Sequence, residues 1–136
     1  MPTLTIGELA KESGVHLETI RYYEREGLML VPPRKTSRHR AYPSSATRRL
    51  RFIKRVQELG FTLSEIRELL MLRAEPGEDC SEVCRQAQQK LAEVRVKIGQ
   101  LQAIEEALLR LTAGCSGDRP VSECGILEAL DREVAL

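Results

Sequence analysis

The feature that most constrains this chain is a stretch of about 30 residues, from Ser81 to Thr112, with no proline and a single glycine, Gly99. Apolar residues recur along it at steps of three and four: Leu91, Val94, Ile98, Leu101, Ile104, Leu108 and Leu111. This periodicity predicts one helix with a single apolar stripe, about 45 Å long at ~1.5 Å of rise per residue.

The rest of the 136-residue chain is too short to cover that stripe along its whole length. The simplest way to cover it is the same helix of a second subunit, packed antiparallel as a coiled coil. The alternative is that the helix folds back onto the N-terminal part of its own chain. We therefore expect a homodimer.

The N-terminal segment has the pattern of a helix-turn-helix. Thr5 and Glu8 form a capping box that opens a short helix ending near Glu12, and a second helix is expected over Leu17–Arg25, with Gly27 as its stop signal. A helix-turn-helix needs a small residue where the helices meet, a glycine at the turn and a branched apolar residue inside. The residues in these places are Ala10, Gly14 and Ile20.

The chain after Gly27 alternates between loops and helices. The segment from Val31 to Pro43 has no helical periodicity and is typical of an exposed loop or a small β-wing. Ser44 or Ser45 is expected to cap the next helix, which ends at Gly60, and Thr62 with Glu65 forms a second capping box. The sequence Glu75-Pro76-Gly77-Glu78 then interrupts the helical pattern before the long helix.

Charge is distributed unevenly along the chain. Residues 1–75 carry a net charge of +5 and residues 76–136 a net charge of −4, and no acidic residue lies between Glu26 and Glu58. That interval contains nine cations: Arg34, Lys35, Arg38, Arg40, Arg48, Arg49, Arg51, Lys54 and Arg55. Because lysine and arginine neutralise DNA phosphates, this half is predicted to bind double-stranded DNA. The alternative is a basic surface that is merely solvated.

Several motifs resemble those of the MerR family of transcription regulators over essentially the whole chain. Residues 6–10 (IGELA) and 18–28 (ETIRYYEREGL) look like the opening of that family, and Arg40-x-Tyr42 resembles the end of its wing. Residues 50–54 (LRFIK) and 59–66 (LGFTLSEI) resemble its second helical pair.

The resemblance implies a winged helix-turn-helix domain and an antiparallel coiled-coil dimer. It also implies a regulator that sits on a promoter with an overlong spacer and, with its effector bound, bends and untwists the DNA, so that it acts on RNA polymerase indirectly. The expected contacts with DNA come from the second helix and the wing: His16, Thr19, Arg21, Tyr22, Tyr23, Arg34, Lys35, Arg38, Arg40 and Tyr42.

Four cysteines lie in the C-terminal half, Cys80, Cys84, Cys115 and Cys124. Cys80 precedes the long helix and Cys115 follows it, so the helix length separates them within one chain. In an antiparallel dimer, Cys80 of one chain would lie beside Cys115 and Cys124 of the other. This spacing is similar to that of the metal-sensing branch of the family, and it predicts two equivalent sites for a thiophilic metal ion.

Three sulfur ligands without a nearby histidine favour mercury(II), our first expectation, or lead(II). Zinc(II) and cadmium(II) are alternatives that would need a fourth ligand, from Cys84 or from the carboxylate of Asp79, Asp118 or Glu123. The other interpretation of Cys84 is a small residue buried against the coiled coil. The N-terminal half and residues 59–66 look more like mercury sensors, whereas Gly125-Ile126-Leu127 looks more like the lead-responsive branch.

The sequence therefore predicts a mainly α fold in three parts. Residues 1–75 form the DNA-binding domain, residues 76–113 the linker and dimerisation helix, and residues 114–136 a metal-binding loop and terminal helix. No signal peptide or membrane-spanning run is evident, which predicts a cytoplasmic protein with reduced thiols.

Proteins of other classes fit less well. A thiol–disulfide sensor is an alternative use of the cysteines. An iron–sulfur cluster would need its ligands close together, a drug-binding regulator would need a larger C-terminal domain, and an enzyme would need a carboxylate or nucleophile near the histidines.

Overall fold

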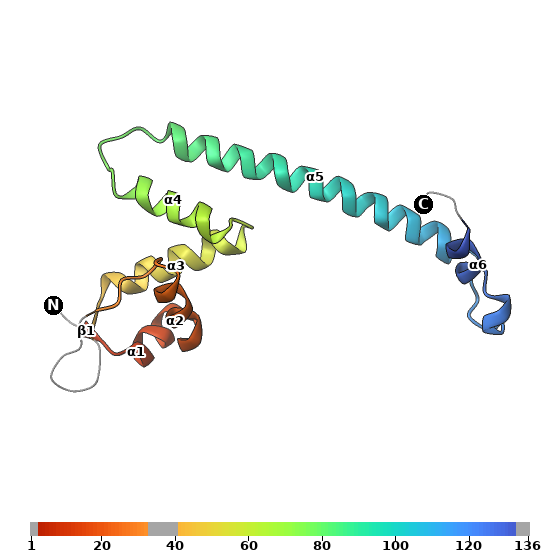
Figure 1. The fold of residues 1–136 in the computed structure, drawn as a ribbon, viewed down its shortest axis with the longest axis horizontal. Helices are drawn as coiled ribbons and strands as arrows, with labels where there is room; N and C mark the ends of the chain where they lie inside the picture. The colour runs from red at the N-terminus through yellow and green to blue at the C-terminus, as the bar shows by residue number, and fades with distance from the viewer. Residues whose placement is uncertain (1–2, 33–40, 133–136) are drawn as a thin grey trace. The chain divides into compact units, whose positions relative to one another are not determined.

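The structure, a computed structural model, describes residues 3–32 and 41–132. Its elements are, in order, β1 (Thr3–Leu4), α1 (Ile6–Ser13), α2 (Leu17–Arg25), β2 (Tyr42–Pro43), α3 (Ser45–Glu58), α4 (Leu63–Arg73), α5 (Ser81–Thr112), the 3₁₀ turn η1 (Val121–Glu123) and α6 (Gly125–Asp131) (Figure 1). The chain divides into two compact units, Met1–Gln86 and Ala87–Leu136. The mainly α architecture expected from the sequence is confirmed.

The helix-turn-helix segment formed by α1 and α2 has the predicted caps and turn. The hydroxyl of Thr5 accepts a hydrogen bond from the backbone N–H of Glu8, and the Glu8 carboxylate accepts one from the backbone N–H of Thr5, which completes the capping box. Gly14 ends α1 in the left-handed conformation with φ 69°, where a side chain would be strained. The second helix begins at Leu17 and ends at Arg25, as predicted.

The first unit also contains a short sheet. β1 pairs antiparallel with β2, with Thr3 opposite Pro43 and Leu4 opposite Tyr42. The first strand was not expected, because two residues are too few to show an alternating pattern. Residues 33–40 of the expected loop or wing lie outside the described residues.

The predicted caps of α3 and α4 have different outcomes. Thr62 forms a complete capping box with Glu65 at the start of α4, as expected. Ser44 takes the N-cap position of α3, but its side chain makes no capping hydrogen bond. Its backbone is already helical (φ −58°, ψ −28°), whereas both threonine caps are extended, so this part of the prediction is wrong.

The four short helices of the first unit and its sheet pack around one hydrophobic core. Its buried apolar side chains come from α1, α2, the turn after α2, β2, α3 and α4. The fully buried ones are Leu9, Ile20, Leu28, Tyr42, Leu50, Ile53 and Ile66. Ile20 therefore lies inside, as the helix-turn-helix pattern required.

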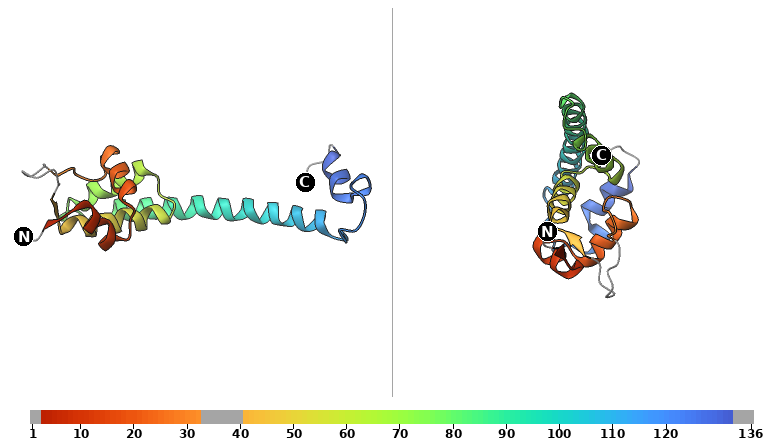
Figure 2. Two further views of the ribbon diagram at one scale, coloured as in Figure 1. Left: turned by 90° about the horizontal axis from the view of Figure 1, so that it is seen from below. Right: turned by 90° about the vertical axis from the view of Figure 1, so that its left-hand side faces the viewer.

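Helix α5 is continuous over the predicted range of Ser81–Thr112 (Figures 1 and 2). Most of the apolar residues of its stripe are exposed in the single chain, including Leu91, Ile98, Leu101 and Leu108. The expected terminal helix is present as α6. Among the residues the structure describes, no helix is long and apolar enough to cross a membrane.

Candidate nucleic-acid interface and candidate metal centre

The predicted contacts on α2 differ in exposure. His16, the N-cap residue, is exposed and makes no capping hydrogen bond, and Arg21 is exposed with one guanidinium nitrogen 3.4 Å from Glu18 Oε1. Thr19 is half-buried. The side chain of Tyr22 is 38% exposed, and the Arg25 guanidinium lies 5.9 Å from the centre of its ring. These side chains give α2 a surface with both donors and an aromatic ring.

Two tyrosines of the predicted interface lie in the core instead. Tyr23 is 3% exposed and donates a hydrogen bond of 2.5 Å to Gln57, while Tyr42 is 1% exposed and donates one of 2.8 Å to Glu24. Burial raises the pKa of the Tyr23 hydroxyl. Both hydroxyl groups are thus used within the domain, where they tie α2 to α3 and β2.

Several cations of the acid-free interval bind backbone carbonyls. Arg49 donates to the carbonyl of Leu28 (2.7 Å), Arg51 to that of Glu12 (2.8 Å) and Lys54 to that of Gly14 (3.0 Å). The carbonyls of Glu12 and Gly14 lie at the C-terminal end of α1, where a helix leaves carbonyl groups without a partner, and that of Leu28 lies in the turn after α2. The count of charges along the sequence could not distinguish these structural hydrogen bonds from phosphate binding. The hydrogen bonds depend on how α3 packs against α1.

Other cations keep their charge available. Arg48 and Arg55 are exposed on α3 and form no hydrogen bond or ion pair with the described residues. The four predicted wing cations, Arg34, Lys35, Arg38 and Arg40, lie outside the described residues.

All four cysteines are free thiols, and Cys80, Cys84 and Cys115 are exposed. Cys80 precedes α5, and its carbonyl accepts a hydrogen bond of 2.9 Å from the backbone N–H of Cys84 one turn later. Cys84 is thus exposed in the single chain, not buried in it. Within the described part of one chain, no three histidine, cysteine or acidic side chains lie close enough together to hold a metal ion.

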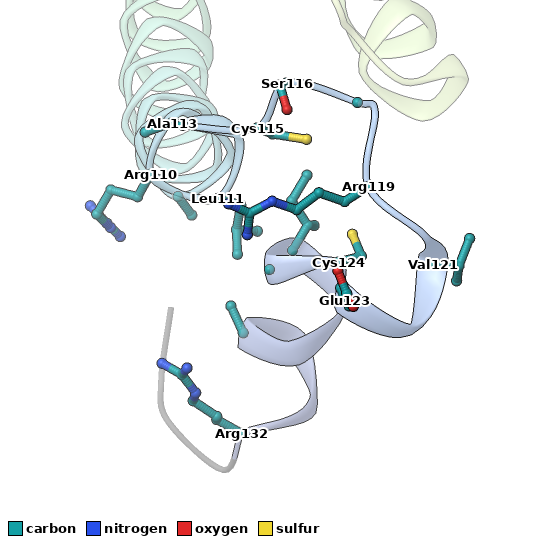
Figure 3. A pocket seen from close by; sticks show the side chains of 16 residues that line it. Arg110, Leu111, Ala113, Cys115, Ser116, Arg119, Val121, Glu123, Cys124 and Arg132 are labelled. Carbon is teal, nitrogen blue, oxygen red and sulfur yellow. The ribbon is translucent and has the colours of Figure 1, made fainter.

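Cys115 and Cys124 line one cavity of about 610 Å³ at the end of α5 (Figure 3). Gly114, just before Cys115, and Gly117, in the loop between the two cysteines, both have positive φ, and that loop reaches Cys124 through η1. Cys124 is half-buried and occupies the N-cap position of α6. The loop therefore places two thiols that are nine positions apart in the sequence on the wall of the same cavity.

The carboxylates considered as a fourth ligand have different surroundings. Asp79 accepts hydrogen bonds from the hydroxyl and the backbone N–H of Ser81, which lower the pKa of its carboxyl group. Asp118 accepts a hydrogen bond from Ser116 within the loop. Glu123 lines the same cavity as the two thiols. Glu123 is thus the carboxylate that shares a cavity with cysteine.

Comparison with known proteins identifies related sequences over the full chain. Residues 4–72 match the family model "MerR HTH family regulatory protein", and residues 47–111 match "MerR, DNA binding". The chain is 40% identical over 136 residues to the mercuric resistance operon regulatory protein of Pseudomonas fluorescens, covering all of this chain and 93% of that protein. It is 42% identical over 129 residues to the regulator ZntR of Escherichia coli K12, covering 93% and 92% of the two chains.

A solved structure extends this similarity to the fold. The transcription regulator PbrR691 from Ralstonia metallidurans CH34, in complex with lead(II), superposes with a TM-score of 0.82 at 40% identity. The alignment covers 93% of this chain and 98% of that one. The names of all three proteins describe regulators, and none describes an enzyme.

Proposed function

Because the chain belongs to the MerR family of helix-turn-helix regulatory proteins, we propose that it is a metal-responsive transcription regulator that binds promoter DNA as a homodimer. It is not an enzyme. The observation that carries the metal-sensing part is the cavity shared by Cys115 and Cys124, since two soft donors line one space.

The exposed surface of α2 and the wing contact DNA. His16, Arg21 and Tyr22 supply side chains that reach base edges and phosphates, and Thr19 lies between them along the helix. Arg48 and Arg55 add charge that no described carboxylate neutralises. Tyr23 and Tyr42 support this surface from the core through their bonds to Gln57 and Glu24.

The dimer forms through the exposed stripe of α5. In the single chain, Leu91, Ile98, Leu101 and Leu108 are 47–65% exposed, and a second antiparallel α5 would cover them. An isologous pair of this kind buries the same stripe on both chains.

The donor set fits a soft metal ion only across two chains. Cys115 and Cys124 supply two thiolates, and no described third donor completes a group of three in the same chain. A helix of 32 residues rises about 48 Å at ~1.5 Å per residue. Cys80 before α5 therefore completes the site of the partner subunit in an antiparallel pair.

We take mercury(II) as the first candidate ion and lead(II) as the second. A relative that covers the whole chain is named for mercuric resistance, and the related PbrR691 structure contains lead(II). Three thiolates suit either ion, whereas zinc(II) or cadmium(II) would need a fourth donor. A thiol-buffered competition of the apo dimer among the four ions would rank them.

Metal binding changes the promoter rather than releasing the protein. In this proposal the same operator is occupied with and without metal, and the metal-bound dimer bends and untwists the DNA so that RNA polymerase can use it. The free energy of metal binding offsets a DNA deformation on the order of 1–6 kcal/mol.

Single substitutions at the three site cysteines test the proposal. Cys80→Ser, Cys115→Ser and Cys124→Ser should each abolish metal-dependent transcription from the operator promoter and leave operator binding intact. Cys84→Ser is the matched control, because it is also an exposed thiol of the same chain, and it should respond to mercury(II) like the wild type. Full induction in any of the three site variants would contradict the ligand assignment.

A further inference from the structure

The cavity that contains Cys115 and Cys124 is rich in positive charge. Its lining includes the guanidinium groups of Arg110, Arg119 and Arg132 but only one carboxylate, Glu123. Arg132 is already paired, since one guanidinium nitrogen lies 3.4 Å from Glu128 Oε1. Such a lining is unexpected around a site for a cation.

The arginines differ in where their side chains point. Figure 3 shows Arg119 extending into the hollow between Cys115 and Cys124, while Arg110 points away from it. Arg119 lies in the loop that joins the two cysteines and forms no ion pair or hydrogen bond with any described residue. Its charge is therefore available to whatever occupies the cavity.

The charge of the bound complex explains this arrangement. A divalent ion held by three thiolates has a net charge of −1, although the ion itself is a cation. A guanidinium stays protonated at all physiological pH values and so supplies a constant compensating charge. An all-sulfur complex is stabilised next to it, whereas a complex with fewer thiolates gains nothing from that charge.

We propose that Arg119 is a specificity-determining residue of the metal site, which favours an all-thiolate complex of a divalent ion by compensating its negative charge. The proposal rests on the proposed function of Cys80, Cys115 and Cys124. Arg119 is not a ligand in it. It acts on the complex electrostatically, through the space of the cavity that it shares with two of the three sulfur atoms.

Lead(II) titrations of the full-length apo dimer test this assignment. The readout is the sulfur-to-lead charge-transfer absorption, measured in competition with a chelator of known affinity. Arg119→Gln should weaken binding roughly three- to tenfold at low salt, and Arg119→Lys should stay within about twofold of the wild type. The loss should shrink in about 1 M salt, where the screening length falls to ~3 Å. The absorption band of Arg119→Gln should keep its position, because the ligands are unchanged.

Arg110→Gln is the matched control, since it removes the same charge from the same cavity wall but from a side chain that points away. It should bind lead(II) like the wild type. Equal losses in Arg110→Gln and Arg119→Gln, wild-type affinity in Arg119→Gln, or tighter binding in Arg119→Gln would each overturn the assignment. A shifted absorption band in Arg119→Gln would also overturn it.

Failure of the metal site itself would look different. Cys115→Ser should lose the lead–sulfur absorption altogether. If Cys115→Ser kept it, the proposed site would be wrong whatever Arg119 does. If Cys115→Ser lost it and Arg119→Gln matched the wild type, only the role of Arg119 would be overturned.

Discussion

The two compact units differ in how much of their apolar surface a single chain can bury. In Met1–Gln86, side chains from four helices and a two-stranded sheet meet in one core, and Leu9, Ile20, Leu50 and Ile53 are completely enclosed. In Ala87–Leu136, most of the large apolar side chains of α5 remain exposed, and the two thiols of the loop have no third ligand among the described residues. The first unit buries its core within one chain, whereas the second leaves an apolar stripe that the proposed partner subunit would cover.

This difference separates the two halves of the function. The proposed DNA reading depends on a domain whose shape is set by its own core. Metal sensing, as proposed, depends on a site that would form only when two chains associate. In that proposal dimerisation is part of the metal chemistry, and the ion would act on both subunits at once.

A charge in the middle of the α5 stripe should have the largest effect. Leu101→Glu places a carboxylate at a side chain that is 65% exposed in one chain but buried in the proposed coiled coil. An unpaired charge buried in an interface costs on the order of 3–5 kcal/mol, so the dimer should dissociate into monomers. Sedimentation at micromolar protein concentration measures this.

Val96→Glu is the control for that variant. Val96 is 61% exposed and lies five residues from Leu101, or about 140° around the helix, away from the stripe. It should remain dimeric. A dimeric Leu101→Glu protein, or a monomeric Val96→Glu protein, would show that the stripe is not the interface.

Truncation of a core residue should destabilise the first unit, Met1–Gln86. Leu50 is completely buried on α3, and Leu50→Ala should destabilise the N-terminal unit by about 2–5 kcal/mol through lost contacts and a cavity. Leu59→Ala, at an exposed leucine just beyond the same helix, should change stability by less than about 0.5 kcal/mol. Urea unfolding followed by circular dichroism distinguishes them, and equal losses would contradict the core described above.

A smaller effect is expected at the helix caps. Thr62→Ala removes the hydroxyl that accepts from the backbone N–H of Glu65 and should cost about 1 kcal/mol. Ser44→Ala should cost almost nothing, because Ser44 makes no capping hydrogen bond. Thermal unfolding of the two variants measures the difference, and a larger loss from Ser44→Ala would be inconsistent with these caps.

The smallest effect is expected for Tyr23→Phe. Removing the bond from the Tyr23 hydroxyl to Gln57 should cost roughly 0.5–1 kcal/mol near neutral pH, since Gln57 can be hydrated instead. Because burial raises the pKa of Tyr23 in the folded state, the unfolded chain loses this proton first as the pH rises. Wild-type stability should therefore fall above pH ~10, and that fall should be smaller in Tyr23→Phe. An unchanged pH dependence would mean that Tyr23 does not cause it.

The helices could be predicted because their signals are local. The threonine–glutamate capping boxes and the proline-free run from Ser81 give the bounds of α1, α4 and α5 within a residue or two. The failure at Ser44 has a local cause as well, since its backbone conformation, not its residue type, decides whether the hydroxyl can cap. β1 depends on pairing with a strand about forty residues later, which no short window reveals.

The candidate sites were less predictable because they depend on packing. Tyr22 and Tyr23 are the same residue type and adjacent in the sequence. They lie on different faces of α2, so that Tyr22 is exposed and Tyr23 is buried. Arg49, Arg51 and Lys54 are indistinguishable from phosphate-binding cations until α3 is packed beside the ends of α1 and α2. The inward direction of Arg119 needs the folded loop, since the sequence shows only a polar segment between two cysteines.

The central claim, that each metal site takes ligands from both chains, is tested most directly by a mixed dimer. One subunit carries Cys80→Ser and the other Cys115→Ser, and bound lead(II) is counted per purified heterodimer. If the sites are shared, one site loses both substituted ligands and the other keeps all three, so the heterodimer should bind one ion while each parental homodimer binds none. A heterodimer that binds none, or a parental homodimer that binds two, would contradict a site shared between the chains.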